Sequence, residues 1–239
     1  YKRQAKAIQM IKSVPGYEKL VRLFMKLGYE MQYRGENLAN MVRVTPHCYP
    51  QIYGLFKEVV NKTGIKEPEL YIYNDPEMNA YTYGETRTFV ALSSSIVEKL
   101  TPEELKGIMA HECGHILCKH ALYKTMFRTL RDMGAFMGLI HRTLFAPLYL
   151  ALQYWNRKSE LSADRCGMII TSEEIYQSSL VKLASGLKET PGMSRCLIEQ
   201  GKQYEAFKHS SLWSRIQQEY RCVFYSCLLY TSPSPRDYA

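Results

Sequence analysis

The sequence TPEELKGIMAHECGHILCKH, residues 101–120, joins a strong helix start to a pattern that can bind a metal ion. Thr101 is a favourable N-cap, Pro102 suits the first helical position, and Glu104 stands where it can close a capping box. The stretch therefore predicts a helix from Thr101 to about His120. The second half of this helix carries the most distinctive chemistry in the chain.

His111-Glu112-Cys113-Gly114-His115 matches the HExxH pattern. Two histidines four residues apart project from one face of a helix, so both imidazoles can bind a single metal ion. Glu112 is then placed to take a proton from a water on the metal and to pass it to a leaving amine. A pentapeptide of this kind arises by chance in roughly 1% of chains of this size, so the motif needs support from its surroundings.

A catalytic zinc site needs three protein ligands and one open position. Downstream, Glu160 and Asp164 lie one helical turn apart in a polar segment. We expect Glu160 to be the third ligand, on a second helix, and Asp164 to accept a hydrogen bond from the imidazole of His111. The alternative is that both acids are surface charges paired with the neighbouring Arg and Lys residues.

Before the motif, the sequence predicts one helix followed by a small sheet. A helix is predicted from about Pro50 to Lys62, with Gly64 beyond its end. Three short runs rich in Tyr, Thr, Phe and Val then follow, and they predict a small antiparallel sheet. These runs are Glu69–Tyr73, Asn79–Tyr83 and Thr88–Leu92. After Thr101 the patterns are helical only, so the fold class is α+β and mostly helical.

The composition fits one sizeable folded domain. Of the 239 residues, 46% are hydrophobic and 23% charged, which argues against wholesale disorder. We divide the chain into a basic helical region (1–64), the main domain (65–221) and a tail (222–239). That tail, which ends in CLLYTSPSPRDYA, is either non-native sequence or a flexible Ser/Pro-rich end.

Charge and hydropathy raise the question of membrane contact. Residues 1–44 hold nine Lys or Arg against three Glu, most of the net charge of +8. Such a region either lies against an anionic membrane or presents a solvated helix face. Residues 133–155 are apolar, but the longest uncharged stretch is 14 residues (143–156), short of the about 20 that span a bilayer. A buried core helix and a membrane-touching hairpin both remain open.

Neither nucleic acid nor a disulfide scaffold is indicated. No nucleic-acid-binding signature accompanies the basic charge, so we expect no such partner. The seven cysteines lack the spacing of a disulfide framework, and a reducing, cytoplasmic setting fits them best. The chain begins with Tyr1, so a signal or membrane anchor could precede it.

HECGH followed 45 residues later by ExxxD resembles the gluzincin peptidases, specifically the HtpX-like and CAAX-prenyl-protease-type family. Residues 76–84 (PEMNAYTYG) are similar to the Asn-Ala-aromatic segment of that family. His120 matches a histidine common after the motif. The segment from His209 to Ile216 resembles its late His-Pro…Arg-Ile motif, with Ser210 in place of Pro.

This resemblance implies a zinc metalloendopeptidase that acts on protein or peptide substrates with one zinc ion. It implies that Asn79 helps to hold the substrate backbone and that His209 stabilises the oxyanion. Tyr81 would line the cleft, although packing within the sheet is the alternative. His120, five residues past His115, is expected to point away from the ligand face.

Two other classes of function stay open on the sequence alone. One is a non-catalytic peptide-binding or chaperone-like module that keeps zinc for stability, although such a protein tends to lose the base, which is present here as Glu112. The other is a membrane-surface interaction protein built on residues 1–44 and 133–155, with the histidine motif accidental.

Overall fold

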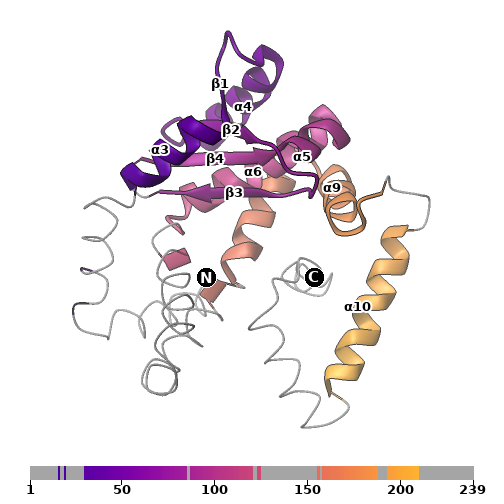
Figure 1. Ribbon diagram of the computed structural model, residues 1–239. Helices are drawn as coiled ribbons and strands as arrows, with labels where there is room; N and C mark the ends of the chain where they lie inside the picture. The colour runs from indigo at the N-terminus through magenta and orange to yellow at the C-terminus, as the bar shows by residue number, and fades with distance from the viewer. Residues whose placement is uncertain are drawn as a thin grey trace.

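A computed structural model describes residues 30–84, 87–120, 123–124, 155–156, 158–187 and 193–209, together with Gly16 and Lys19. A four-stranded sheet and the helices packed on it form the main body (Figure 1). The named elements are α3 (Glu30–Asn40), β1 (Val42–Val44), α4 (Pro50–Thr63), β2 (Glu69–Tyr73), β3 (Ala80–Tyr83), β4 (Phe89–Ser93), α5 (Ser94–Lys99), α6 (Pro102–Leu117), α9 (Glu173–Ser185) and α10 (Met193–His209). Residues 158–170 form a further helical segment.

The sheet is mixed rather than antiparallel throughout, which corrects the expectation from the sequence. Its order is β1-β2-β4-β3. The β1–β2 and β3–β4 pairs are antiparallel, whereas β2 and β4 run parallel. The reason is that β4 inserts between β2 and β3. Since β3 reverses the direction of the chain and β4 reverses it again, β4 ends up parallel to β2.

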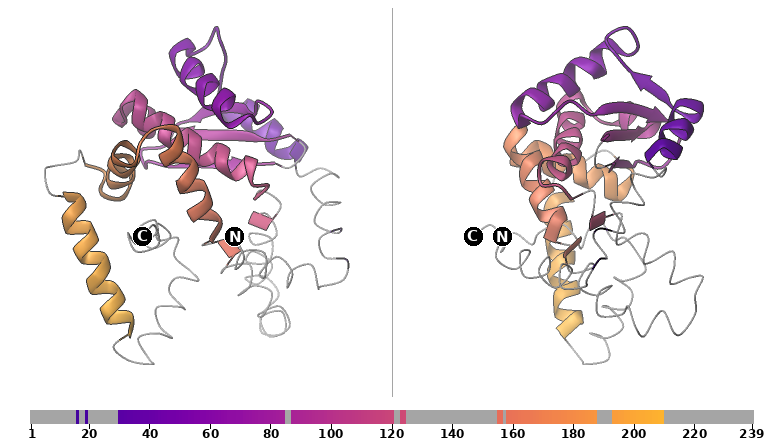
Figure 2. Two further views of the ribbon diagram at one scale, coloured as in Figure 1. Left: turned by 180° about the vertical axis from the view of Figure 1, so that it is seen from behind. Right: turned by 90° about the vertical axis from the view of Figure 1, so that its left-hand side faces the viewer.

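The two faces of the sheet have different roles. The register pairs Leu70 with Val90 and Ile72 with Leu92, and these side chains enter the hydrophobic core. The core is completed by Phe56 of α4 and by residues of α6. Figure 2 shows α4 and α6 on one side of the sheet and α3 on the other.

The opposite face carries an aromatic cluster. Phe89 makes ring contacts with Tyr71, Tyr81 and Tyr83, at centroid distances of 5.9, 6.1 and 6.0 Å, and Tyr73 contacts Tyr81 at 5.7 Å. Successive side chains of a strand point to opposite faces. Thr82 therefore faces α6, whereas its neighbours Tyr81 and Tyr83 face the other way. Tyr81 therefore lies on the side of the sheet away from α6.

The predicted start of the motif helix is confirmed. Thr101 accepts a hydrogen bond from the backbone N–H of Glu104, and the Glu104 carboxylate accepts one from the N–H of Thr101, closing the capping box. Glu104 also pairs with Lys182 of α9 at 2.7 Å, which ties the start of α6 to α9. The predicted helix before the sheet is confirmed as well. It ends at Thr63, with Gly64 in the left-handed conformation (φ 67°).

Several sequence-based expectations fall outside the described residues. They include most of the basic region before residue 30, residues 133–154 of the apolar run, and the whole tail from 222 to 239. Within the part of the chain that is described, no helix is both long and apolar enough to cross a bilayer. Helix α4 belongs to the region 1–64, which we separated from the main domain. It packs on α6 and contributes to the same hydrophobic core.

Candidate metal centre

The structure brings the three predicted ligands together at one point. His111 and His115 come from α6, and Glu160 comes from the segment 158–170. The Nε2 atoms of the two histidines lie 3.2 Å apart. Oε2 of Glu160 lies 3.3 Å from Nε2 of His111 and 3.4 Å from Nε2 of His115. Among the described residues this is the one group of three or more His, Cys, Asp or Glu able to hold a metal ion.

These distances match a tetrahedral zinc site. Ligand atoms about 2.0–2.1 Å from a tetrahedral zinc lie about 3.3–3.4 Å from one another, which is the spacing of the three atoms here. Two imidazole nitrogens and one carboxylate oxygen are donors that zinc prefers, and three protein ligands leave a fourth position for water or substrate. The side chains are also shielded, with exposed fractions of 15%, 1% and 18% for His111, His115 and Glu160.

Glycine inside the motif lets the two helices that carry the candidate ligands approach each other. A Cβ on Gly114 would lie 2.9 Å from Cβ of Cys166 and 3.1 Å from Cα of Ala163. Any larger side chain at residue 114 would push the segment 158–170 away from α6. The close contact occurs one turn from Glu160, so it sets the distance between that carboxylate and the histidine pair.

His111 is held by two partners on its other ring nitrogen. Its Nδ1 lies 3.0 Å from Oδ1 of Asp164, as the sequence suggested, and 2.8 Å from the hydroxyl of Tyr176 on α9. The Tyr176 hydroxyl in turn donates to Asp164 at 2.6 Å. Burial alone would lower the pKa of His111, but hydrogen bonds to Asp164 and Glu160 outweigh it and raise the pKa to about 10.

Tyr176 was not identified from the sequence. Burial and the charge of Asp164 hold the pKa of its phenol well above the ordinary value, so it stays a hydrogen-bond donor. Together Asp164 and Tyr176 fix the ring of His111 with Nε2 toward the candidate metal position.

His120 contacts His115, contrary to the expectation that it points away. Their Nδ1 atoms lie 2.9 Å apart. The reason is that α6 ends at Leu117 in a Schellman turn, in which Lys119 adopts the left-handed conformation (φ 56°). The N–H of His120 then donates to the carbonyl of His115, which folds the imidazole back beside the ligand. With Nε2 of His115 used for a metal, its Nδ1–H is the donor to His120.

The candidate base is anchored to the sheet. The hydroxyl of Thr82 on β3 donates to Oε2 of Glu112 at 2.7 Å, and both side chains are buried. Thr82 was also not identified from the sequence, although the alternation of β3 places it on the α6 side. Thr82 thus fixes one carboxylate oxygen of Glu112, and the other oxygen can accept a proton.

A lysine completes the surroundings of the ligands. Nζ of Lys124 lies 3.0 Å from Oε1 of Glu160 and 2.9 Å from Nε2 of His115. Burial alone would raise the pKa of Glu160, but Lys124 and the two histidines hold it well below its ordinary value. Burial, and then the charge of Lys124, hold the pKa of His115 well below its ordinary value.

The position of Tyr176 depends on a glycine, which gives a testable prediction. A Cβ on Gly167 would lie 2.4 and 2.6 Å from ring atoms of Tyr176. Gly167→Ala is expected to displace that ring from Asp164 and His111. We expect a loss of about 2–3 kcal/mol in the free energy of unfolding and about 10–100-fold in zinc affinity, measured by urea denaturation and zinc titration.

Gly54→Ala is the matched control, because nothing lies within 4 Å of a Cβ at that helical position. It is expected to leave zinc affinity unchanged and to alter stability by less than about 1 kcal/mol. If Gly167→Ala and Gly54→Ala had the same zinc affinity and the same free energy of unfolding, the role given to Tyr176 would be contradicted.

The remaining predicted site residues lie at three places. Asn79 is exposed at the start of β3. Tyr81 packs in the aromatic cluster described above, on the far side of β3 from Glu112. His209 is the last residue of α10, and its side chain lies outside what the structure describes. Contact of these three with substrate stays a prediction.

A histidine pair on one helix, completed by a glutamate from a second helix, defines the gluzincin class of metal site. The model of peptidase family M48 matches residues 47–236, most of the chain. The chain therefore belongs to peptidase family M48, which confirms the resemblance proposed from its motifs.

A curated relative points the same way. Over 213 residues the chain is 28% identical to plastoglobule-localized metallopeptidase 48, chloroplastic, of Arabidopsis thaliana. The alignment covers 85% of this chain and 60% of the relative. The chain thus spans well under the full length of this relative.

Proposed function

We propose that this chain is a zinc-dependent metalloendopeptidase. The observation that carries the proposal is the triangle of His111, His115 and Glu160 atoms, with edges of 3.2–3.4 Å. Membership of peptidase family M48 supports the same reading. One zinc ion held by these residues would be the cofactor, and a protein or peptide would be the substrate.

The chemistry divides between the ion and one carboxylate. When bound, zinc acidifies a coordinated water and polarises the scissile carbonyl. Glu112 accepts the proton of the attacking water and then delivers it to the leaving amine, as base and then as acid. Thr82 keeps Glu112 in one orientation through both transfers.

Substrate is proposed to bind along β3. This strand stands at one end of the sheet order, beside α6, so its outer edge can accept an extended peptide as an added strand. Asn79, exposed where β3 begins, would hold the substrate backbone at that edge. Oxyanion stabilisation by His209 rests on the resemblance of its motif alone.

We also propose a cytoplasmic, reducing setting with peripheral contact to a membrane through residues 1–44 and 133–155. Five cysteines of the described part are free, which suits a reducing compartment. The basic charge and the apolar run of these two regions supply the chemistry for membrane contact. The Arabidopsis relative is named for the plastoglobule and the chloroplast.

Metal analysis and proteolysis of the purified chain test the proposal. One zinc per chain is expected, with hydrolysis of denatured casein that a chelator abolishes and added zinc restores. Zinc without hydrolysis would favour a peptide-binding module instead. A chain that binds no zinc but floats with anionic liposomes would favour the membrane-surface alternative.

A further inference from the structure

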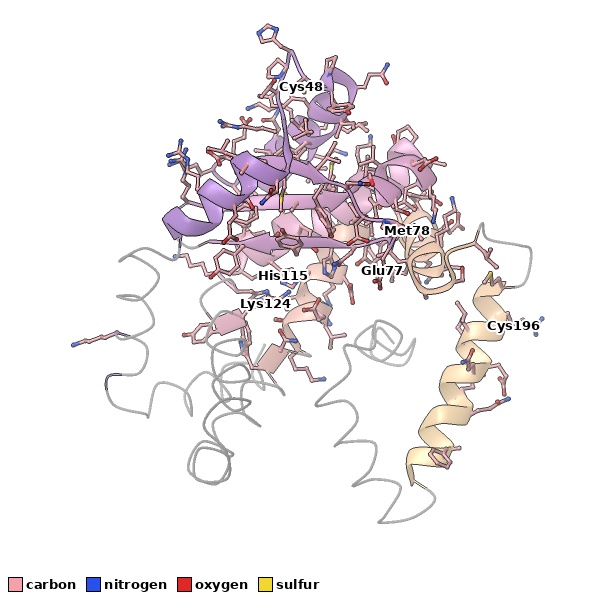
Figure 3. The ribbon with its side chains drawn as sticks, in the orientation of Figure 1. Cys48, Glu77, Met78, His115, Lys124 and Cys196 are labelled. Carbon is pink, nitrogen blue, oxygen red and sulfur yellow. The ribbon has the colours of Figure 1, made fainter. Side chains whose placement is uncertain are left out.

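Lys124 places a positive charge within the ligand set itself. Its ammonium contacts Oε1 of Glu160 and Nε2 of His115, at 3.0 and 2.9 Å. The side chain of Lys124 is only 21% exposed and that of Glu160 only 18%, so water screens this pair weakly. Figure 3 shows His115 and Lys124 close together below the sheet.

The backbone fixes this position. The N–H of Lys124 donates to the carbonyl of His120 at 2.9 Å, so Lys124 lies one helical turn beyond the residue that folds back on His115. The preceding residue, Tyr123, makes a ring contact of 5.1 Å with the buried Trp155. These contacts hold the base of the lysine side chain on the side of the ligands.

Lys124 and zinc need the same lone pair. An ammonium only donates hydrogen bonds, and a neutral imidazole nitrogen has one lone pair with which to accept one or to bind a metal. Nε2 of His115 can therefore serve Lys124 or zinc, but not both. Glu160 differs, because Lys124 contacts Oε1 whereas Oε2 faces the histidines.

We infer that Lys124 competes with zinc for this site: it neutralises Glu160 when no zinc is bound and lowers the affinity for zinc. This inference rests on the proposed zinc site. Zinc binding would displace the ammonium from His115, and the repulsion between two cations so close together in a shielded site adds to the cost.

The test compares Lys124→Met with the unaltered chain in two measurements. Zinc affinity is measured by competition with a chromophoric chelator, and Tm is measured for the zinc-free and zinc-loaded forms. Lys124→Met is expected to bind zinc at least about tenfold more tightly. Its zinc-free form is expected to melt lower, because Glu160 loses its counter-ion, while the zinc-loaded form melts near the unaltered chain.

Lys66→Met is the matched control, since Lys66 is an exposed lysine in the loop between α4 and β2, and it should change neither quantity. Weaker or equal zinc binding by Lys124→Met would overturn the inference, because a merely structural lysine would lower the Tm of both forms without tightening zinc. If Lys124→Met does not fold, Lys124→Gln, which removes the positive charge and stays polar, carries the same expectation. If the unaltered chain binds no zinc, the proposed function fails and this inference with it.

Discussion

Changing Glu112 to Gln is expected to lower kcat/KM for peptide hydrolysis by about 100- to 10,000-fold and to leave zinc binding intact. An amide has nearly the size and shape of a carboxylate, and its oxygen can still accept the hydrogen bond that Thr82 gives at 2.7 Å. It cannot take up the proton of the attacking water. Since His111, His115 and Glu160 are untouched, the variant should lose a chemical step and keep its metal.

Two measurements separate this outcome from simple damage to the fold. Zinc content per chain and Tm should match the unaltered protein, while casein hydrolysis falls. Glu103→Gln is the control, because Glu103 lies on the same helix but is largely exposed, and full activity is expected of it. Hydrolysis by Glu112→Gln within about threefold of the unaltered chain would remove Glu112 from its assigned role.

Local features of this fold follow from the sequence because local chemistry decides them. The capping box of Thr101 and Glu104 and the glycine after α4 use contacts between residues a few positions apart. The spacing of His111 and His115 likewise needs only the geometry of one helix. Glu160 could be proposed as the third ligand from the sequence because a catalytic zinc would need three protein ligands and the two histidines supply only two.

The sheet order could not be predicted in this way. The three runs before the motif were identified within a residue or so of their observed bounds. Which strand lies in the middle is decided by burial, and β4 (FVALS) is buried along its whole length. A strand covered on both faces and bonded on both edges takes the central position, and its nearly continuous apolar run was the available signal.

The positions of Tyr176 and His120, which contact the candidate ligands, depend on tertiary contacts and on how α6 ends. Tyr176 reaches His111 only because Gly107 and Gly167 leave room for its ring, and nothing in its own neighbourhood in the sequence indicates this. His120 was misplaced because we expected α6 to continue to that residue. Lys119 is not a glycine, so the turn that ends α6 carried no sequence signal.

The second large effect is expected from Glu160→Ala, which should remove most of the zinc. In the proposed site Glu160 supplies one of three ligand atoms and the only negative charge among them, so its loss would leave two imidazoles on one helix. Loss of an outer hydrogen-bond partner costs about 10–100-fold in metal affinity, and loss of a ligand should exceed that. We expect zinc per chain to fall below about a tenth of the unaltered value after dialysis, with hydrolysis falling in parallel.

The decisive contrast for Glu160→Ala is with Glu112→Gln, because both should lack hydrolysis and only one should lack zinc. Glu199→Ala controls for the loss of an exposed glutamate, since Glu199 is exposed and pairs with Lys202, which is exposed as well. Lys124 would lose its carboxylate partner in Glu160→Ala and remain beside His115, where by the inference above it would still compete with zinc for Nε2. Zinc retained at full stoichiometry would therefore mean that a different residue is the third ligand, and the pairing of α6 with the segment 158–170 would no longer account for the site.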